Sequence, residues 1–164
     1  MGSSVIKSST SAQSSKGKIL NELEKLVQAS YTKEDVNLFI VGVDLDEPDH
    51  TGEIHKKQLQ ELYSRIPQRI QESSKMKIIC FSPVQAIEAW LSYQHNKTIQ
   101  ANSLEKLSPR ELKKLLYGTN RVNPRIAEKL AKDIDVEHLI KQSKSFDHFY
   151  KQLNPPKSKK PKIT

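Results

Sequence analysis

Cysteine and tryptophan each occur once in this chain, and no apolar run approaches the length of a membrane span. A single cysteine, Cys80, excludes a disulfide framework and any zinc site built from four cysteines. Cys80 lies in an apolar run, which favours a small buried side chain over a catalytic thiol. A membrane helix needs about 20 consecutive apolar residues, and the N-terminus lacks the apolar centre of a secretory signal. We therefore expect a cytoplasmic protein that makes no membrane contact.

The net charge of +8 is concentrated at the two ends of the chain. Residues 157–164 carry four lysines and residues 1–18 carry three, with no acid in either segment, which leaves +1 for the residues between them. Inside the chain, residues 34–53 hold seven acids and no Lys or Arg, whereas residues 97–132 hold nine Lys or Arg and three acids. An acidic pocket beside a basic surface suits a metal-dependent enzyme acting on phosphodiesters, but two ordinary solvated faces would give the same pattern.

Composition and hydrophobic spacing divide the chain into four parts. Residues 1–16 are rich in Ser and residues 154–164 are rich in Pro and Lys, so neither end can bury an apolar face, and both are predicted to be disordered. Residues 17–95 are predicted to form an α/β core with a small, mostly parallel sheet and flanking helices. Residues 96–153 are predicted to form a basic helical subdomain.

Two short apolar runs predict the strands of that sheet. The first begins at Val36 and ends abruptly at Asp44, and the second covers residues 77–81. Each reads as a fully buried strand of a parallel sheet, and the long segment between them predicts a crossover helix.

The remaining apolar residues recur at helical spacing. A first helix is expected through residues 19–27, and a second from about 52 to 72 with Thr51 as its N-cap and a kink or break at Pro67. Pro83 is expected at the first position of a third helix, which includes Val84. Further short helices are expected from the capping box of Ser108 and Glu111 to Gly118, from Asn123-Pro124, over residues 136–140, and from Ser145 to about Leu153.

Two aspartates follow the first predicted strand directly. Asp44 and Asp46 are two residues apart, so on an extended backbone their carboxylates leave from the same face. Paired carboxylates repel one another unless a cation lies between them, and hard oxygen ligands favour Mg²⁺, Ca²⁺ or Mn²⁺. Ligands of α/β sheets bind beyond the carboxyl ends of the strands. The alternative is a solvated acidic turn, since Glu-Pro-Asp follows immediately.

Glu88 is the next candidate for a site. It lies in the apolar segment after the second strand, and neighbouring strands would bring it to the same sheet edge as Asp44 and Asp46. A third carboxylate would complete an oxygen-rich magnesium site. The alternative is that Glu88 faces solvent between buried Ile87 and Leu91. Trp90 is expected in the core.

Five basic residues in the helical part are candidates for contacts with nucleic acid. Their charges and the nearby helix N-termini could grip a phosphate backbone, while a solvated basic face remains the alternative. These residues are Arg110, Lys113, Lys114, Arg121 and Arg125.

Three pieces of the chain together resemble a known family. Residues 40–46 resemble the Asp-x-Asp strand of Toprim domains, and residues 82–91 resemble the Glu-Ala-Trp-Leu helix of the Toprim-like bacterial families grouped with RloB and the OLD nucleases. Helical segments between 112 and 149 resemble the tail of an uncharacterised Toprim-like family in that group. The resemblance covers roughly residues 36–153.

This resemblance implies a magnesium-dependent (or manganese-dependent) nuclease that acts on phosphodiesters, in bacterial defence against foreign DNA. Asp44 and Asp46 would hold the metal, with Glu88 beside them. Toprim domains open with a strand that ends in Glu, and this chain has no such strand before its first predicted helix. It has lost that strand, or it is a fragment, or its site is degenerate. The competing function is a non-catalytic nucleic-acid or protein-interaction module, whose partner would be encoded in the same operon.

Overall fold

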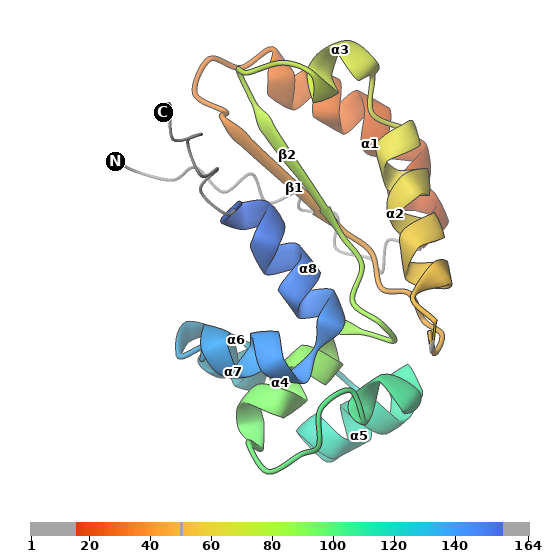
Figure 1. The fold of residues 1–164 in the computed structure, drawn as a ribbon, viewed down its shortest axis with the longest axis vertical. Helices are drawn as coiled ribbons and strands as arrows, with labels where there is room; N and C mark the ends of the chain where they lie inside the picture. Colours follow the sequence, from red (N-terminus) through yellow and green to blue (C-terminus); the bar gives the residue numbers. More distant parts are fainter. Residues whose placement is uncertain (1–15, 50, 156–164) are drawn as a thin grey trace, which may run out of the picture.

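The computed structural model describes residues 16–49 and 51–155 (Figure 1). The predictions of disorder for residues 1–16 and 154–164 therefore lie almost wholly outside the described residues. The fold is α/β, with a parallel pair of strands and flanking helices. In chain order the elements are α1 (Lys16–Tyr31), β1 (Leu38–Gly42), α2 (Glu53–Ser64), α3 (Gln68–Gln71), β2 (Lys77–Phe81), α4 (Ile87–His95), the 3₁₀ turn η1 (Leu104–Lys106), α5 (Pro109–Tyr117), α6 (Pro124–Lys132), α7 (Val136–Gln142) and α8 (Lys144–Leu153).

The sheet is confirmed as parallel. β1 pairs with β2 in a register that runs from Leu38 opposite Lys77 to Gly42 opposite Phe81. Figure 1 shows the two strands between α1 and α2 on one side and α8 on the other. Because partners in register share a face, the odd residues of β1 point toward α1 and α2, and the even residues point toward the side of α8.

A first apolar core lies between the sheet and α1, α2 and α3. Apolar side chains at three- and four-residue spacing on the helices meet the odd residues of β1, which is why these segments fold as amphipathic helices. The fully or nearly fully buried members are Leu20, Leu23, Val27, Val41, Val43, Leu59, Leu62, Ile66, Ile70, Met76 and Cys80.

A second apolar core is built around Trp90 of α4, which confirms the expected burial of that ring. The Trp90 ring stacks on Phe149 and meets Phe146 edge to face, both from α8. Leu112 of α5 and Leu139 of α7 are fully buried in the same core. α4 thus packs with the C-terminal helices, even though it follows the second strand directly.

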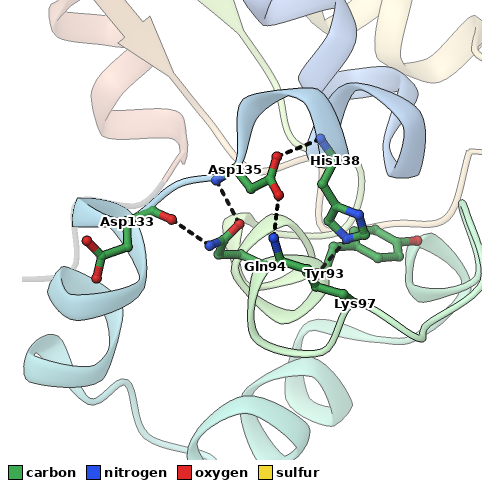
Figure 2. A network of polar contacts seen from close by, with 6 residues as sticks. All are labelled: Tyr93, Gln94, Lys97, Asp133, Asp135 and His138. Atoms are coloured by element: carbon green, nitrogen blue, oxygen red, sulfur yellow. Dashed lines mark hydrogen bonds and ion pairs between the residues drawn. The ribbon is translucent and has the colours of Figure 1, made fainter.

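A polar network fixes the junction of α6 and α7 on α4 (Figure 2). The Gln94 amide donates to the carbonyl of Asp133 at 2.7 Å and accepts from the N–H of Asp135 at 2.9 Å. The Asp135 carboxylate caps α7 through the N–H of His138 and pairs with Lys97. These bonds satisfy helix-end groups that would otherwise lack partners, so the network is structural.

The absence of a side chain at Gly42 leaves room for the Phe81 ring at the end of β1. A Cβ on Gly42 would lie 2.2 Å from Cζ of the Phe81 ring. That ring is held in turn by Trp90 and Phe149, with centroids 5.7 Å and 4.8 Å away. The Phe81 ring thus joins the end of the sheet to the second core, which contains Trp90.

Several expected elements are confirmed and three expectations are wrong. The break at Pro67, the capping box at Ser108 and the helix end at Gly118 all occur as expected. Neither strand is fully buried, since one residue of β1 and two of β2 are buried. In β1 the even-numbered residues stay open because α8 covers their face of the sheet mainly over β2. The N-cap of α2 is Gly52 instead of Thr51, since the Asp49 carboxylate binds the first N–H groups. Helix α4 begins at Ile87 instead of Pro83, because the chain first continues alongside the β1 loop.

Candidate functional site

The two strands end side by side, and their loops remain bonded to each other. Val43 donates to the carbonyl of Phe81 at 3.3 Å, and Leu45 donates to that of Pro83 at 3.1 Å. The Ser82 hydroxyl donates to the Val43 carbonyl at 2.8 Å. This continued pairing brings Asp44, two residues after β1, next to the first turn of α4. The position is the sheet edge where α/β proteins bind ligands.

Asp44 is half-buried at the centre of this edge. Its Oδ1 accepts a hydrogen bond from the backbone N–H of Ile87 at 3.1 Å, across the two loops. Burial first and the charge of Glu88 second raise the pKa of Asp44 to about 6, against the opposing effects of the Ile87 N–H and the charge of Lys113. Asp44 therefore combines a structural bond with a carboxyl group whose ionisation is unfavourable.

Glu88 lies beside Asp44 and is almost completely buried, with 4% of its surface exposed. The expected alternative, a solvent-facing Glu88, is wrong, and it is Ile87 that is 42% exposed. α4 begins four residues later than expected, and Glu88 lies on its buried side in the first turn. Among the described residues, no salt bridge involves Asp44 or Glu88. A buried carboxylate without a countercharge is costly, so the site favours a nearby cation.

Asp46 is exposed and lies on a different backbone geometry from the one expected. Its φ is +62°, and its N–H donates to the carbonyl of Gln85 at 2.9 Å. The chain is therefore not extended at Asp46, and the extended backbone expected to place both carboxylates on one face is absent. Asp46 is still near enough for its charge to raise the pKa of Asp44.

Helix α5 brings Lys113 and Tyr117 toward the carboxylates. The two residues are one turn apart and half-buried, and they flank the buried stripe of Leu112 and Leu116. The charge of Lys113 lowers the pKa of Asp44. Burial, and next the charge of Glu88, raise the pKa of Tyr117 to about 12. The neutral phenol of Tyr117 and the ammonium group of Lys113 thus lie on the side of the acid pair that faces α5.

The five predicted nucleic-acid residues divide into two groups. Arg110 and Lys114 line an open hollow of about 480 Å³ together with Glu111 and residues 118–120, on the flank of α5 next to Lys113. Arg121, three residues before α6, and Arg125, the second residue of α6, are both exposed. At about 100° per residue, one sector of α5 about 100° wide carries Lys113, Tyr117, Arg110 and Lys114.

Two residues near the acids, Gln85 and Tyr117, were not predicted from the sequence. Gln85 is 2% exposed, has φ +66°, and its Oε1 has no hydrogen-bond partner among the described residues. Nothing in the local sequence marks it, because the strain arises from a tertiary pairing of loops. Tyr117 does have a sequence signal, namely its four-residue spacing from Lys113 beside two leucines.

Within residues 16–49 and 51–155, no group of three or more His, Cys, Asp or Glu side chains is arranged to hold a metal ion. The same residues include no helix with the length and apolarity needed to cross a membrane. No protein-family model, curated protein or solved structure matches the chain.

Proposed function

We propose that the chain is a Toprim-like, divalent-metal-dependent protein of the nuclease type that acts on nucleic-acid phosphodiesters. The observation that carries the proposal is the pairing of Asp44 with buried Glu88 beyond the ends of two parallel strands, without a salt bridge to either in the described chain. Magnesium is commonly held by one or two carboxylates together with water and substrate phosphate. Two carboxylates therefore suffice, and Asp46 is close enough to add its charge.

The residues around the acid pair fit a phosphate substrate. A bound Mg²⁺ would polarise a phosphoryl oxygen and lower the pKa of a bound water. Lys113 would attract the phosphate toward the acids, and Tyr117 would offer a neutral hydroxyl donor. Arg110 and Lys114 continue the positive charge outward along α5, where a neighbouring stretch of backbone would lie.

A cleavage assay tests the proposal. Plasmid DNA and single-stranded RNA are incubated with the protein and Mg²⁺ or Mn²⁺, and products are resolved on gels. Glu88→Gln and Asp44→Asn should lower the cleavage rate on the order of 100-fold, as loss of a principal electrostatic group does. The control is Asp135→Asn, which changes another helix-capping aspartate away from the acids. Equal cleavage by Glu88→Gln and wild type would contradict the proposal.

Charge reversal tests the basic flank separately. The double variant Arg110→Glu/Lys114→Glu should weaken DNA binding and reduce its salt dependence, because each lost phosphate contact lowers the salt slope by about one. The matched control Lys25→Glu/Lys33→Glu reverses two exposed lysines of α1 and its following turn. Equal losses in both double variants would indicate only non-specific attraction to a basic protein.

The second candidate function is a non-catalytic interaction module. The observation that favours it is the arrangement of the acids, since no three-ligand group is present in the described residues. Metal binding without cleavage of either nucleic acid would support this candidate over the first.

A further inference from the structure

Within residues 16–49 and 51–155, the outer edge of β1 has no backbone partner. Bonds from Lys77 N–H to the Asn37 carbonyl (2.8 Å) and from Val43 N–H to the Phe81 carbonyl bracket the parallel pair. The odd residues of β1 therefore turn their backbone groups toward β2. Leu38, Ile40 and Gly42 direct theirs outward, and within the described residues no hydrogen bond involving these outward groups is present.

The side chains at this edge are apolar and exposed. Leu38 is 42% exposed and Ile40 is 45% exposed, whereas Ile79, which lies opposite Ile40 on the same face, is fully buried. α8 lies over β2, where Gln152 donates to the Cys80 carbonyl at 2.9 Å. In the part of the chain that the structure describes, the half of this face over β1 is therefore exposed and adjoins a strand edge without a partner.

The usual protection of a free edge is missing here. Proteins block exposed strand edges with Lys, Pro or a bulge, and β1 (Leu-Phe-Ile-Val-Gly) has none of these. Both ends of the strand carry exposed acids instead: Glu34 and Asp35 before it, and Asp46 and Glu47 after it.

We propose that β1 accepts an extended segment of a partner protein as a third strand. The outward backbone groups of Leu38, Ile40 and Gly42 would bind the backbone of that segment. Its apolar residues, at alternate positions, would cover Leu38 and Ile40. Its two ends would carry Lys or Arg, because acids flank β1 at both ends. The inference is independent of whether the acid pair is catalytic.

A second copy of the chain fits this edge poorly. Antiparallel pairing of β1 with its own copy, centred on Ile40, would set Asp46 opposite Glu34 at each end, and like charges opposite each other are unfavourable. A stable dimer also buries about 800 Å² on each partner, which is more than a five-residue edge with two exposed side chains offers.

The probe is a nine-residue synthetic peptide with valine at alternate central positions and two lysines at each end. Its binding is measured by fluorescence anisotropy against a peptide with the same centre and glutamates at the ends. We expect the lysine-flanked peptide to bind at least about tenfold more tightly, as oppositely charged flanks imply. Ile40→Lys should weaken binding about tenfold, while the control Leu115→Lys, at a 54% exposed leucine of α5, leaves it unchanged.

Amide exchange measured by NMR tests the geometry. On addition of the peptide, the N–H groups of Leu38, Ile40 and Gly42 should gain protection, while those of Phe39 and Val41, already turned toward β2, change little. No peptide binding, equal binding of the acid-flanked peptide, or protection without this alternation would overturn the inference. A protein that is dimeric in light scattering and loses the dimer in Ile40→Lys would assign the edge to a second copy and overturn it as well.

Discussion

The Asp44 carboxylate accepts a hydrogen bond from the N–H of Ile87, the first residue of α4, at 3.1 Å. The residue before α4 is Ala86, which has no side chain to cap the helix. Asp44 supplies that cap from the neighbouring loop, and the same carboxylate lies beside buried Glu88. The Oδ1 atom of Asp44 therefore stabilises the start of α4. The negative charge of the same carboxylate is destabilising, because the group is partly buried next to Glu88.

Replacing Asp44 should separate these two effects. Asp44→Asn keeps an acceptor for the Ile87 N–H and removes the unfavourable charge, so at pH 8 we expect the free energy of unfolding to rise by about 1–3 kcal/mol. Asp44→Ala also loses the cap, which costs about 1 kcal/mol, and should fall below the Asn variant. Urea denaturation at pH 8 measures both. Equal stability of the two variants would show that the Ile87 bond contributes nothing.

The stability of the protein should depend on pH through Asp44. The pKa of this group is about 6 in the fold and about 4 in an unfolded chain. The folded state binds the proton more tightly, so the contribution of Asp44 falls as pH rises from about 4 to about 6, by up to about 3 kcal/mol. The difference in unfolding free energy between wild type and Asp44→Asn, followed from pH 4 to 8, isolates it. A difference that does not change with pH would refute the raised pKa.

Gly42→Ala should destabilise the fold. The new methyl group would meet the Phe81 ring at 2.2 Å, and that ring is confined by Trp90 and Phe149. Overpacking of this kind typically costs about 1–3 kcal/mol, to be measured by urea denaturation. The control Gly17→Ala in α1 has open space around the added atom and should be neutral or stabilising. Phe81→Leu should reduce the cost of Gly42→Ala. Additive effects of the two changes would show that the ring is not the obstacle.

The Ser145 hydroxyl of α8 should stabilise the contact of α8 with the loop between β2 and α4. Its Oγ accepts from the Trp90 indole N–H at 3.0 Å and from the Val84 N–H at 3.4 Å. Ser145→Ala leaves both buried donors without this acceptor, which should cost about 1–3 kcal/mol in thermal or urea unfolding. Ser64→Ala, at an exposed serine bonded only to the carbonyl of Glu61, should change stability by less than about 0.5 kcal/mol. Similar effects of the two substitutions would contradict the assigned role.

Much of the fold could be predicted from local patterns, because caps, prolines and apolar spacing act within a few residues. The Ser108 box and the break at Pro67 are of this kind. The parallel pairing of the two apolar runs was predictable for another reason, because a helix between two buried strands favours a crossover connection. The exposure of Leu38 and Ile40 could not be predicted, since the sequence of a strand does not reveal whether a third strand or a helix lies beside it.

The candidate site was predictable in its residues more than in its geometry. Asp44 and Glu88 were identified from the strand ends and the crossover, and the structure brings them together. Asp46 departs from the extended backbone through a positive φ that depends on its pairing with Gln85. Gln85 and Tyr117 enter the site through loop pairing and helix packing, which act between residues far apart in the chain.

The most direct test of the acid pair is a titration with Mg²⁺ and Mn²⁺, followed by calorimetry and by the fluorescence of Trp90, which shares α4 with Glu88. Wild type should bind the cation, more weakly at pH 5 than at pH 7.5, because Asp44 must lose its proton to act as a ligand. Asp44→Asn and Glu88→Gln should each lose at least about tenfold in affinity, and Asp135→Asn should bind as wild type does. Absence of binding by wild type, or undiminished binding by the first two variants, would contradict a metal site at Asp44 and Glu88.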